Sequence, residues 1–301
     1  MMRLGILAKV LTALLVVHLA FSALASAEEY AHPEVLVDVR WVVANLRNPA
    51  VRVLDVSSER NVYLAGHLPG AVYVDPVSDL TNPQHRVRGM ALNKVQFQIL
   101  MRRLGIRNGD TVVLYDDASN LWAARAFWVF KLYRHEKVVL LNGGSKRWVG
   151  EGQPLVKDVP RFTPSTYVAK DPDHTIVATW DYIVRKLGKG ETLLCDARSP
   201  KEYAGLDVRS ARGGRIPGAI NVEWRLAVNP DGTFKSRAEL EVLYQKAGFS
   251  RDREIITYCQ TGVRAAHTWF VLKYLLGYPR VRNYDGSWEE WGNRTDLPVE
   301  R

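Results

Sequence analysis

The stretch EIITYCQTGVRAAHTWFVLKYLLG, residues 254–277, contains the pattern that decides the fold. It begins with an apolar run typical of a buried strand. From Val263 onward, apolar residues recur at helical spacing as far as Gly277, a common helix-ending residue. Cys259 and a short loop with Gly262 lie between the two runs. The stretch therefore predicts a strand, a loop that starts with a cysteine, and a helix.

The same pattern occurs twice in the chain. Residues 115–148, YDDASNLWAARAFWVFKLYRHEKVVLLNGGSKRW, align without a gap with residues 258–291, YCQTGVRAAHTWFVLKYLLGYPRVRNYDGSWEEW. Upstream, residues 53–75 resemble residues 194–224, in which the second copy carries extra residues before its Gly-x-x-Pro-Gly turn. Repeats of this length indicate two structural units with the same fold.

Short apolar strands alternate with helical patterns in each copy. RVLDV, TVVLYD, TLLCDA and EIITYC are typical of buried strands, and LWAARAFWVFKLYR has apolar residues at helical spacing. This alternation predicts an α/β fold in which each copy forms a mainly parallel sheet flanked by helices. Binding sites in such sheets form at the carboxyl ends of strands, where Cys259 is expected to lie. Prolines and polar residues over Val156–Thr175 predict an extended linker between the copies.

Residues 1–27 have the composition of a secretory signal peptide. Two basic residues precede a short apolar run, and residues 25–27, ASA, form a cleavage pattern. Cleavage there would leave 274 residues, and an uncleaved anchor is the alternative. We therefore expect a periplasmic or secreted protein with no stable membrane insertion after cleavage. The net charge of +9 comes from dispersed Lys and Arg residues, which suits small anions and does not favour nucleic acid as a partner.

The chain has two cysteines in different settings. Cys195 lies within the apolar run ETLLCDAR, which predicts a buried, inert thiol. A disulfide between Cys195 and Cys259 is the alternative in an oxidising compartment. Around Cys259, the loop amides, the helix N-terminus and Arg264 would all stabilise a thiolate over a thiol and hold an anion against the sulfur. Gly262 permits a backbone conformation that residues with a Cβ avoid. The pattern predicts a nucleophile in an anion-binding loop.

The segments YCQTGVRAAHTWF, NYDGSWEEW, DARSPKEYAG and GRIPGAIN resemble the signatures of the tandem-domain rhodaneses, the thiosulfate sulfurtransferases. The resemblance covers nearly all of the chain after residue 27. It implies an inactive rhodanese-like domain over residues 28–155, a linker over 156–175 and a catalytic rhodanese-like domain over 176–301. In the first copy Asp116 stands where the second has Cys259, and an aspartate cannot form a persulfide.

The resemblance also implies a reaction. The Cys259 thiolate would take the sulfane sulfur of thiosulfate as a persulfide and pass it to cyanide or to a thiol acceptor. Cys259 would thus be catalytic, without a cofactor, and we expect a monomer that meets a small anionic donor and a thiophilic acceptor. No histidine–cysteine cluster suggests a metal site. The residues implied in substrate binding are Arg198, Gln260, Thr261, Gly262, Val263 and Arg264.

Three other functions stay open at this point. Sulfurtransferases that act on 3-mercaptopyruvate usually carry Cys-Gly-Ser/Thr-Gly-Val-Thr. Here Gln260 and Arg264 replace the first Gly and the last Thr, and the added positive charge favours thiosulfate. Related phosphatases need Cys-x5-Arg, a loop one residue longer than the one after Cys259. A persulfide carrier or binding protein for an exported partner would have the same loop.

Overall fold

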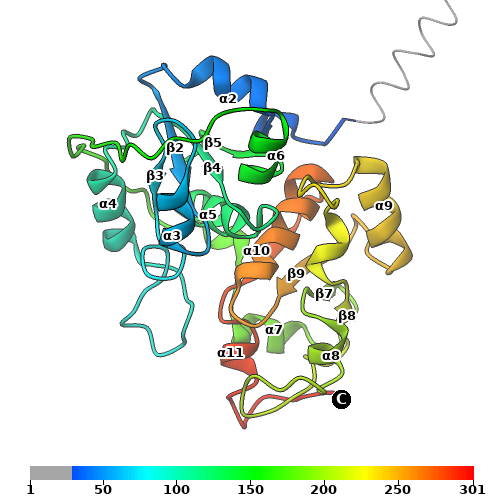
Figure 1. Cartoon of the computed structure of the whole chain (residues 1–301). Helices are drawn as coiled ribbons and strands as arrows, with labels where there is room; N and C mark the ends of the chain where they lie inside the picture. Colours follow the sequence, from blue (N-terminus) through cyan, green and yellow to red (C-terminus); the bar gives the residue numbers. More distant parts are fainter. Residues whose placement is uncertain (1–28) are drawn as a thin grey trace, which may run out of the picture.

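The computed structural model describes residues 29–301, so the predicted signal segment lies outside the described residues. Residues 29–301 form two five-stranded parallel sheets, each flanked by helices (Figure 1). The predicted α/β fold with two tandem units is therefore confirmed. None of the helices within residues 29–301 is both long enough and apolar enough to cross a membrane.

The first domain is built on a sheet with the strand order β1-β5-β4-β2-β3, in which every neighbouring pair is parallel. A short 3-10 turn, η1 (Pro33–Val35), precedes it. Its elements are β1 (Leu36–Val37), α2 (Val39–Asn45), β2 (Val51–Asp55), α3 (Arg60–Ala65), β3 (Val72–Tyr73), α4 (Lys94–Arg103), β4 (Thr111–Tyr115), α5 (Leu121–Leu132), β5 (Val138–Leu141) and α6 (Gly144–Gly150).

The second domain repeats this order as β6-β10-β9-β7-β8, again with every pair parallel. The helix predicted from Val263 to Gly277 is α-helical in its first part only and ends in a π-helical turn, η4. The elements are η2 (His174–Ile176), β6 (Val177–Ala178), α7 (Trp180–Lys186), β7 (Thr192–Asp196), α8 (Pro200–Tyr203), β8 (Ile220–Asn221), η3 (Trp224–Ala227), α9 (Arg237–Lys246), β9 (Glu254–Tyr258), α10 (Val263–Phe270), η4 (Val271–Leu275), β10 (Val281–Tyr284) and α11 (Ser287–Trp291).

Two helices of the second domain begin with the same reciprocal cap. At α8 the Ser199 hydroxyl accepts the amide of Glu202, and the Glu202 carboxylate accepts the amide of Ser199. At α9, Ser236 and Glu239 repeat the arrangement. This capping box satisfies amides that the first helical turn leaves without a partner. It therefore fixes the carboxylate of each glutamate at the start of its helix.

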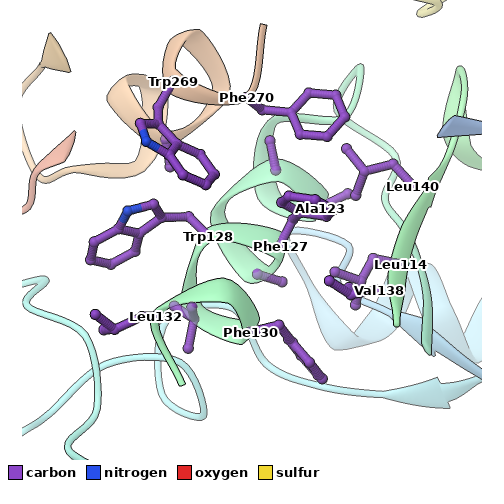
Figure 2. Close-up of a cluster of buried hydrophobic side chains, with 14 of the residues drawn as sticks. Leu114, Ala123, Phe127, Trp128, Phe130, Leu132, Val138, Leu140, Trp269 and Phe270 are labelled. Carbon is purple, nitrogen blue, oxygen red and sulfur yellow. The ribbon is translucent and has the colours of Figure 1, made fainter. Parts of the chain in front are cut away.

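The two domains share one hydrophobic core at the helices α5 and α10. The Phe127 ring of α5 meets the Phe270 ring of α10 edge to face, with ring centroids 4.9 Å apart. Trp269 lies next to Phe270 on the same helix, facing α5 of the first domain (Figure 2). Buried aromatic area of this kind is a main source of packing energy. The packing brings the start of α10, and with it the Cys259 loop, beside the first domain.

Residues 157–173 connect the two sheets and contain no helix or strand. The segment packs on the first domain. Tyr167 is buried, its carbonyl accepts a hydrogen bond from Arg102 at 2.8 Å, and its hydroxyl lies 3.2 Å from His135 Nδ1. The connection is therefore extended and held against the surface by specific polar contacts.

Candidate active site

The Cys259 loop starts where β9 ends. Cys259 follows the last residue of the strand, is 1 % exposed, and is separated from the first residue of α10 by three loop residues. Gly262 caps the helix with φ = 77°, in the left-handed region. A Cβ at this position would lie 2.5 Å from Oδ1 of Asp285. Both the backbone conformation and the close approach of Asp285 therefore require glycine here.

Ser287 ties the two ends of the loop together. Its buried hydroxyl accepts hydrogen bonds from the amides of Cys259 and Gly262, both at 3.1 Å, and donates to the carbonyl of Tyr284 at 2.8 Å. Ser287 itself has φ = 49°, an unusual value for a residue with a Cβ. The turn at the start of α11 thus sets the shape of the cysteine loop.

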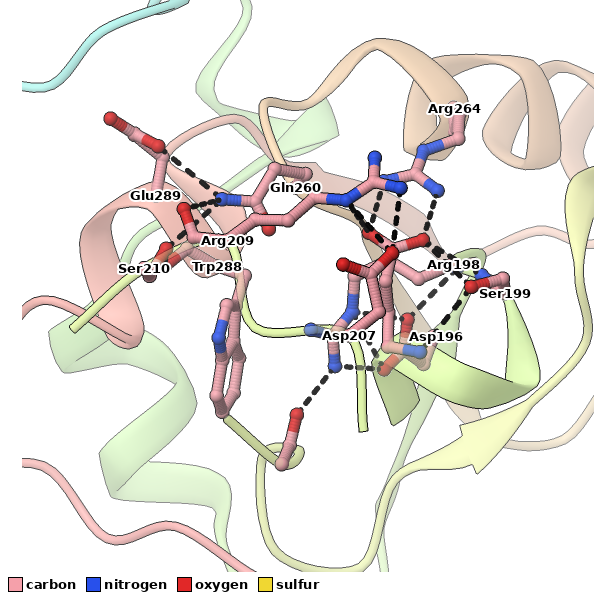
Figure 3. Close-up of polar contacts among 12 residues, drawn as sticks. Asp196, Arg198, Ser199, Asp207, Arg209, Ser210, Gln260, Arg264, Trp288 and Glu289 are labelled. Carbon is pink, nitrogen blue, oxygen red and sulfur yellow. Dashed lines mark hydrogen bonds and ion pairs between the residues drawn. The ribbon is translucent and has the colours of Figure 1, made fainter. Parts of the chain in front are cut away.

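The turn after β10 also binds the loop through its backbone. The amide of Trp288 donates to the carbonyl of Cys259 at 2.9 Å, and that of Glu289 donates to the carbonyl of Gln260 at 2.8 Å. The Gln260 side chain is nearly buried and donates to Ser210 Oγ at 3.0 Å and to Glu289 Oε2 at 3.3 Å (Figure 3). Gln260 therefore links the loop to its neighbours and has little freedom to move.

Arg264 forms a bidentate ion pair with Glu202, which lies 62 residues away in the sequence. Nη1 lies 2.6 Å from Oε2, and Nη2 lies 2.8 Å from Oε1. The side chain of Arg264 is 18 % exposed and that of Glu202 is 1 % exposed. Arg209 approaches the same carboxylate, with Nε at 3.8 Å from Oε1, and also pairs with Asp207 at 2.7 Å (Figure 3).

The pairing changes the titration of both groups. Burial works against the charged form of Glu202, but the hydrogen bonds and charge of Arg264 outweigh it and lower the pKa of Glu202 to about 2. Burial likewise opposes the charge on Arg264, but its hydrogen bonds to Glu202, followed by the charge of Cys259, raise the pKa of Arg264 above its usual value. Arg264 is thus a permanent cation in the first turn of α10, the helix that follows the Cys259 loop.

Arg198, predicted to bind substrate, lies in a different setting from Arg264. Its guanidinium is 1 % exposed, pairs with Asp196 at 2.6 Å and donates to the carbonyl of Gly214 at 2.7 Å. It also lies 4.5 Å from the centre of the Trp288 ring. The Arg198 guanidinium is therefore buried and bonded to other protein groups, whereas the Arg264 side chain beside the loop is partly exposed to solvent.

The first domain reaches the site at Thr261. A Cβ on Gly89 would lie 3.1 Å from Cβ of Thr261, so the two backbones approach closely. Arg88 also contacts Glu289 of the second domain at 3.3 Å. Thr261 and Val263, both predicted in substrate binding, are partly exposed. The segment around Gly89 therefore forms one wall beside the cysteine loop.

Cys195 has none of these features. It lies in β7 with no exposed surface, and burial, followed by the charge of Asp196, raises the pKa of its thiol well above the usual value. Both cysteines are free thiols, so the alternative disulfide is not formed in this structure. Among residues 29–301, no group of three or more His, Cys, Asp or Glu side chains could hold a metal ion.

Asp116 occupies the same place in the first domain as Cys259 does in the second, directly after the strand β4. Burial raises the pKa of this carboxyl to about 6, although hydrogen bonds from the loop amides work in the opposite direction. Among the described residues, the amides of Thr261 and Val263 in the second domain donate no hydrogen bond. The amides that donate to the Asp116 carboxylate, at 2.7–2.9 Å, are those of Ala118, Asn120, Trp122 and Ala123.

Several residues of the site were missed by the sequence reasoning. The Ser199–Glu202 spacing identifies a helix start, but nothing in it indicates that the carboxylate meets Arg264. Ser287 and Asp285 lie in the segment NYDGSWEEW, which sequence reasoning identified as part of a family signature without assigning either residue a contact with the cysteine loop. Their contacts with the loop join residues more than 20 positions apart, which a local pattern does not report.

Comparison with known proteins places both halves of the chain in one family. The model of the rhodanese-like domain matches residues 38–151 and 179–294. The sulfur carrier protein TtuD of Thermus thermophilus is 47 % identical over 281 residues, with 90 % of this chain and 98 % of that protein covered. A thiosulfate sulfurtransferase of Corynebacterium glutamicum is 45 % identical over 288 residues, with 91 % of this chain and 92 % of that protein covered.

The fold comparison leads to the same group of proteins. The 3-mercaptopyruvate sulfotransferase SseA of Escherichia coli superposes with a TM-score of 0.77 at 28 % identity. The match covers 84 % of this chain and 98 % of SseA. The three relatives therefore differ in the substrate or role for which they are named, while they share the two-domain architecture.

Proposed function

The chain belongs to the rhodanese-like family of sulfurtransferases and contains two copies of the domain, and from this we propose that it transfers the sulfane sulfur of thiosulfate to cyanide or a thiol. Cys259 carries the sulfur as a persulfide in this proposal. The observation that carries it is the setting of Cys259, at a strand end, with free loop amides and the cationic Arg264 in the first turn of the following helix. The proposal includes export to the periplasm or the cell exterior, as residues 1–27 predict, and a monomeric state.

The two half-reactions balance without a cofactor. The Cys259 thiolate attacks the outer sulfur of thiosulfate, a new S–S bond forms, and the old S–S bond breaks with its electron pair leaving on sulfite. Cyanide or an acceptor thiolate then attacks the outer sulfur of the persulfide, and the Cys259 thiolate leaves. Each step needs an anion held next to an anionic sulfur, so positive potential at the loop is the main requirement.

The first domain supports this assignment by a comparison within the molecule. Its equivalent loop holds the Asp116 carboxylate with four backbone amides. A loop of this shape can therefore bind an oxyanion through its backbone alone. In the second domain the side chain is a thiol, so the amides of Thr261 and Val263 are free for the donor.

Two observations favour other roles for the same site. The relative named sulfur carrier protein favours a persulfide carrier that hands sulfur to one partner protein, and the fold match to SseA favours 3-mercaptopyruvate as donor. Turnover with thiosulfate and cyanide distinguishes the enzyme from the carrier. Comparison of kcat/KM for thiosulfate and for 3-mercaptopyruvate identifies the donor, and we expect thiosulfate to be preferred because of the cationic Arg264.

The direct experiment is mass spectrometry of the protein after incubation with thiosulfate. We expect one added sulfur atom on the peptide that contains Cys259, and its loss after addition of cyanide with formation of thiocyanate. Cys259→Ser should abolish both, whereas Cys195→Ala should retain both because that thiol is buried and protonated. Added sulfur on Cys195, or none on the wild-type protein, would contradict the proposal.

A further inference from the structure

The carboxylate of Glu202 is held in place by the start of helix α8. Its Oε2 accepts from the amide of Ser199 at 3.1 Å and from the Ser199 hydroxyl at 3.0 Å, within the capping box of α8. The side chain is 1 % exposed. The capping box fixes the position of this buried carboxylate. The position of any cation that pairs with it is therefore set by the start of helix α8.

That partner is Arg264, which belongs to the loop-bearing helix α10. Both of its terminal nitrogens bind Glu202, at 2.6 and 2.8 Å. A bidentate ion pair of this kind fixes the plane as well as the position of the guanidinium. The Arg264 side chain is therefore not free to fold over a bound anion. One edge of its guanidinium is already bonded to the Glu202 carboxylate, and only the rest of the group is available to a ligand.

The other charged groups described around Glu202 belong to two segments. Arg209 and Asp207, which pair with each other, lie in the loop after α8 and are more exposed than Glu202. Asp196 and Arg198 pair with each other at the end of β7 and are buried. Glu202 is thus the one carboxylate among these groups that is both buried and paired with Arg264.

We propose that Glu202 is a positioning residue that fixes Arg264 beside Cys259 and offsets part of its charge, so that the loop binds a dianionic donor and still releases the anion that leaves. This inference rests on the proposed sulfur transfer. An unpaired arginine would hold thiosulfate and sulfite alike, which strengthens binding without favouring turnover. The pairing with Glu202 weakens the equal attraction of Arg264 for thiosulfate and sulfite, while the positive charge of Arg264 stays near the cysteine loop.

The test is Glu202→Gln with Glu239→Gln as the matched control, because Glu239 fills the same capping-box position on α9 and, among residues 29–301, forms no ion pair with an arginine. For Glu202→Gln we expect the KM for thiosulfate to fall about threefold and product inhibition by sulfite to strengthen by a similar factor. The pH midpoint for alkylation of Cys259 by iodoacetamide should fall by about half a unit, because a nearby negative charge is removed. Glu239→Gln should change none of these.

Arg209→Gln removes a positive charge near the loop, whereas Glu202→Gln removes a negative one. Because the Arg209 side chain is exposed, this second test does not depend on whether the Glu202 variant folds. It should raise the KM for thiosulfate and the alkylation midpoint. Equal behaviour of Glu202→Gln and Glu239→Gln, or a shift of both Glu202→Gln and Arg209→Gln in the same direction, would overturn the inference. Alkylation requires no sulfur transfer. If the wild-type protein forms no persulfide while the alkylation shifts occur, the proposed function fails and the electrostatic role of Glu202 stands.

Discussion

Arg125 of the first domain and Asp285 of the second form an ion pair that is buried at the boundary between the domains. The two side chains are 1 % and 4 % exposed, and Nη1 of Arg125 binds Oδ1 of Asp285. The other carboxylate oxygen accepts the amide of Ala91 at 2.7 Å, and Arg125 also donates to the carbonyl of Gly89 at 2.9 Å. Asp285 is at the same time the residue that Gly262 approaches most closely. The pair thus connects the first domain directly to the cysteine loop.

Replacing Asp285 by Asn should be strongly destabilising, because it leaves the Arg125 cation buried without a counter-charge. We expect a loss of about 3–5 kcal/mol in the free energy of unfolding, measured by denaturant titration. Arg88→Gln is the control at the same boundary, since the Arg88 side chain is 77 % exposed and its pair with Glu289 is worth no more than about 1 kcal/mol. Equal stability of the two variants would contradict this account of the boundary.

Gly262→Ala should disrupt the cysteine loop. The new Cβ would meet the carboxylate of Asp285, and the backbone has φ = 77°, which costs a residue with a Cβ about 1–2 kcal/mol. Gly188→Ala is a matched control with φ = 73° and no atom within 4 Å of the new Cβ. We expect both variants to lose stability in thermal unfolding, and only Gly262→Ala to lose thiosulfate turnover by more than about tenfold. Retained turnover in Gly262→Ala would show that the loop tolerates the displacement.

Replacing Arg264 and replacing Arg198 should have different effects, the first on the KM for thiosulfate and the second on thermal stability. Arg264→Gln removes the cation at the loop, and we expect the KM for thiosulfate to rise about tenfold or more, in line with the 1.5–3 kcal/mol of a charge-assisted hydrogen bond. Arg198→Met leaves Asp196 buried without its partner and should lower the thermal midpoint far more than it changes KM. A purely kinetic effect of Arg198→Met with an unchanged midpoint would instead support the predicted substrate-binding role of Arg198.

The Glu202–Arg264 pair should give the protein a specific sensitivity to acid. The pKa of Glu202 is lowered to about 2 in the folded protein, from an ordinary value near 4.5. The carboxylate therefore contributes stability that is complete above pH of about 4.5 and is lost as the pH falls from there through about 2. Thermal midpoints measured between pH 6 and pH 3 should fall more steeply for the wild-type protein than for Glu202→Gln. Parallel curves would show that the pair does not contribute to acid stability.

Much of the fold followed from the chain itself. The gapless alignment of residues 115–148 with residues 258–291 required two units of one architecture, and the two sheets have the same strand order. The nucleophile candidate was also local, because a strand, a cysteine, a glycine and a helix follow one another directly. The helix after Gly262 was predicted as one continuous element, whereas its last turn, whose Val271, Leu272 and Leu275 lie in the shared core, is π-helical, which apolar spacing alone does not indicate.

The sequence by itself determined the two-domain α/β fold, the loop position of Cys259 and the replacement of that cysteine by Asp116 in the first copy, because each is a matter of local order and periodicity. Only the tertiary structure decided which charges meet. Arg264 and Arg198 both follow apolar strands closely, yet one is paired at the loop with Glu202 and the other is buried against Asp196. Ion pairs form wherever folding brings side chains together, across 62 or 160 residues in this chain, and no local pattern specifies that distance.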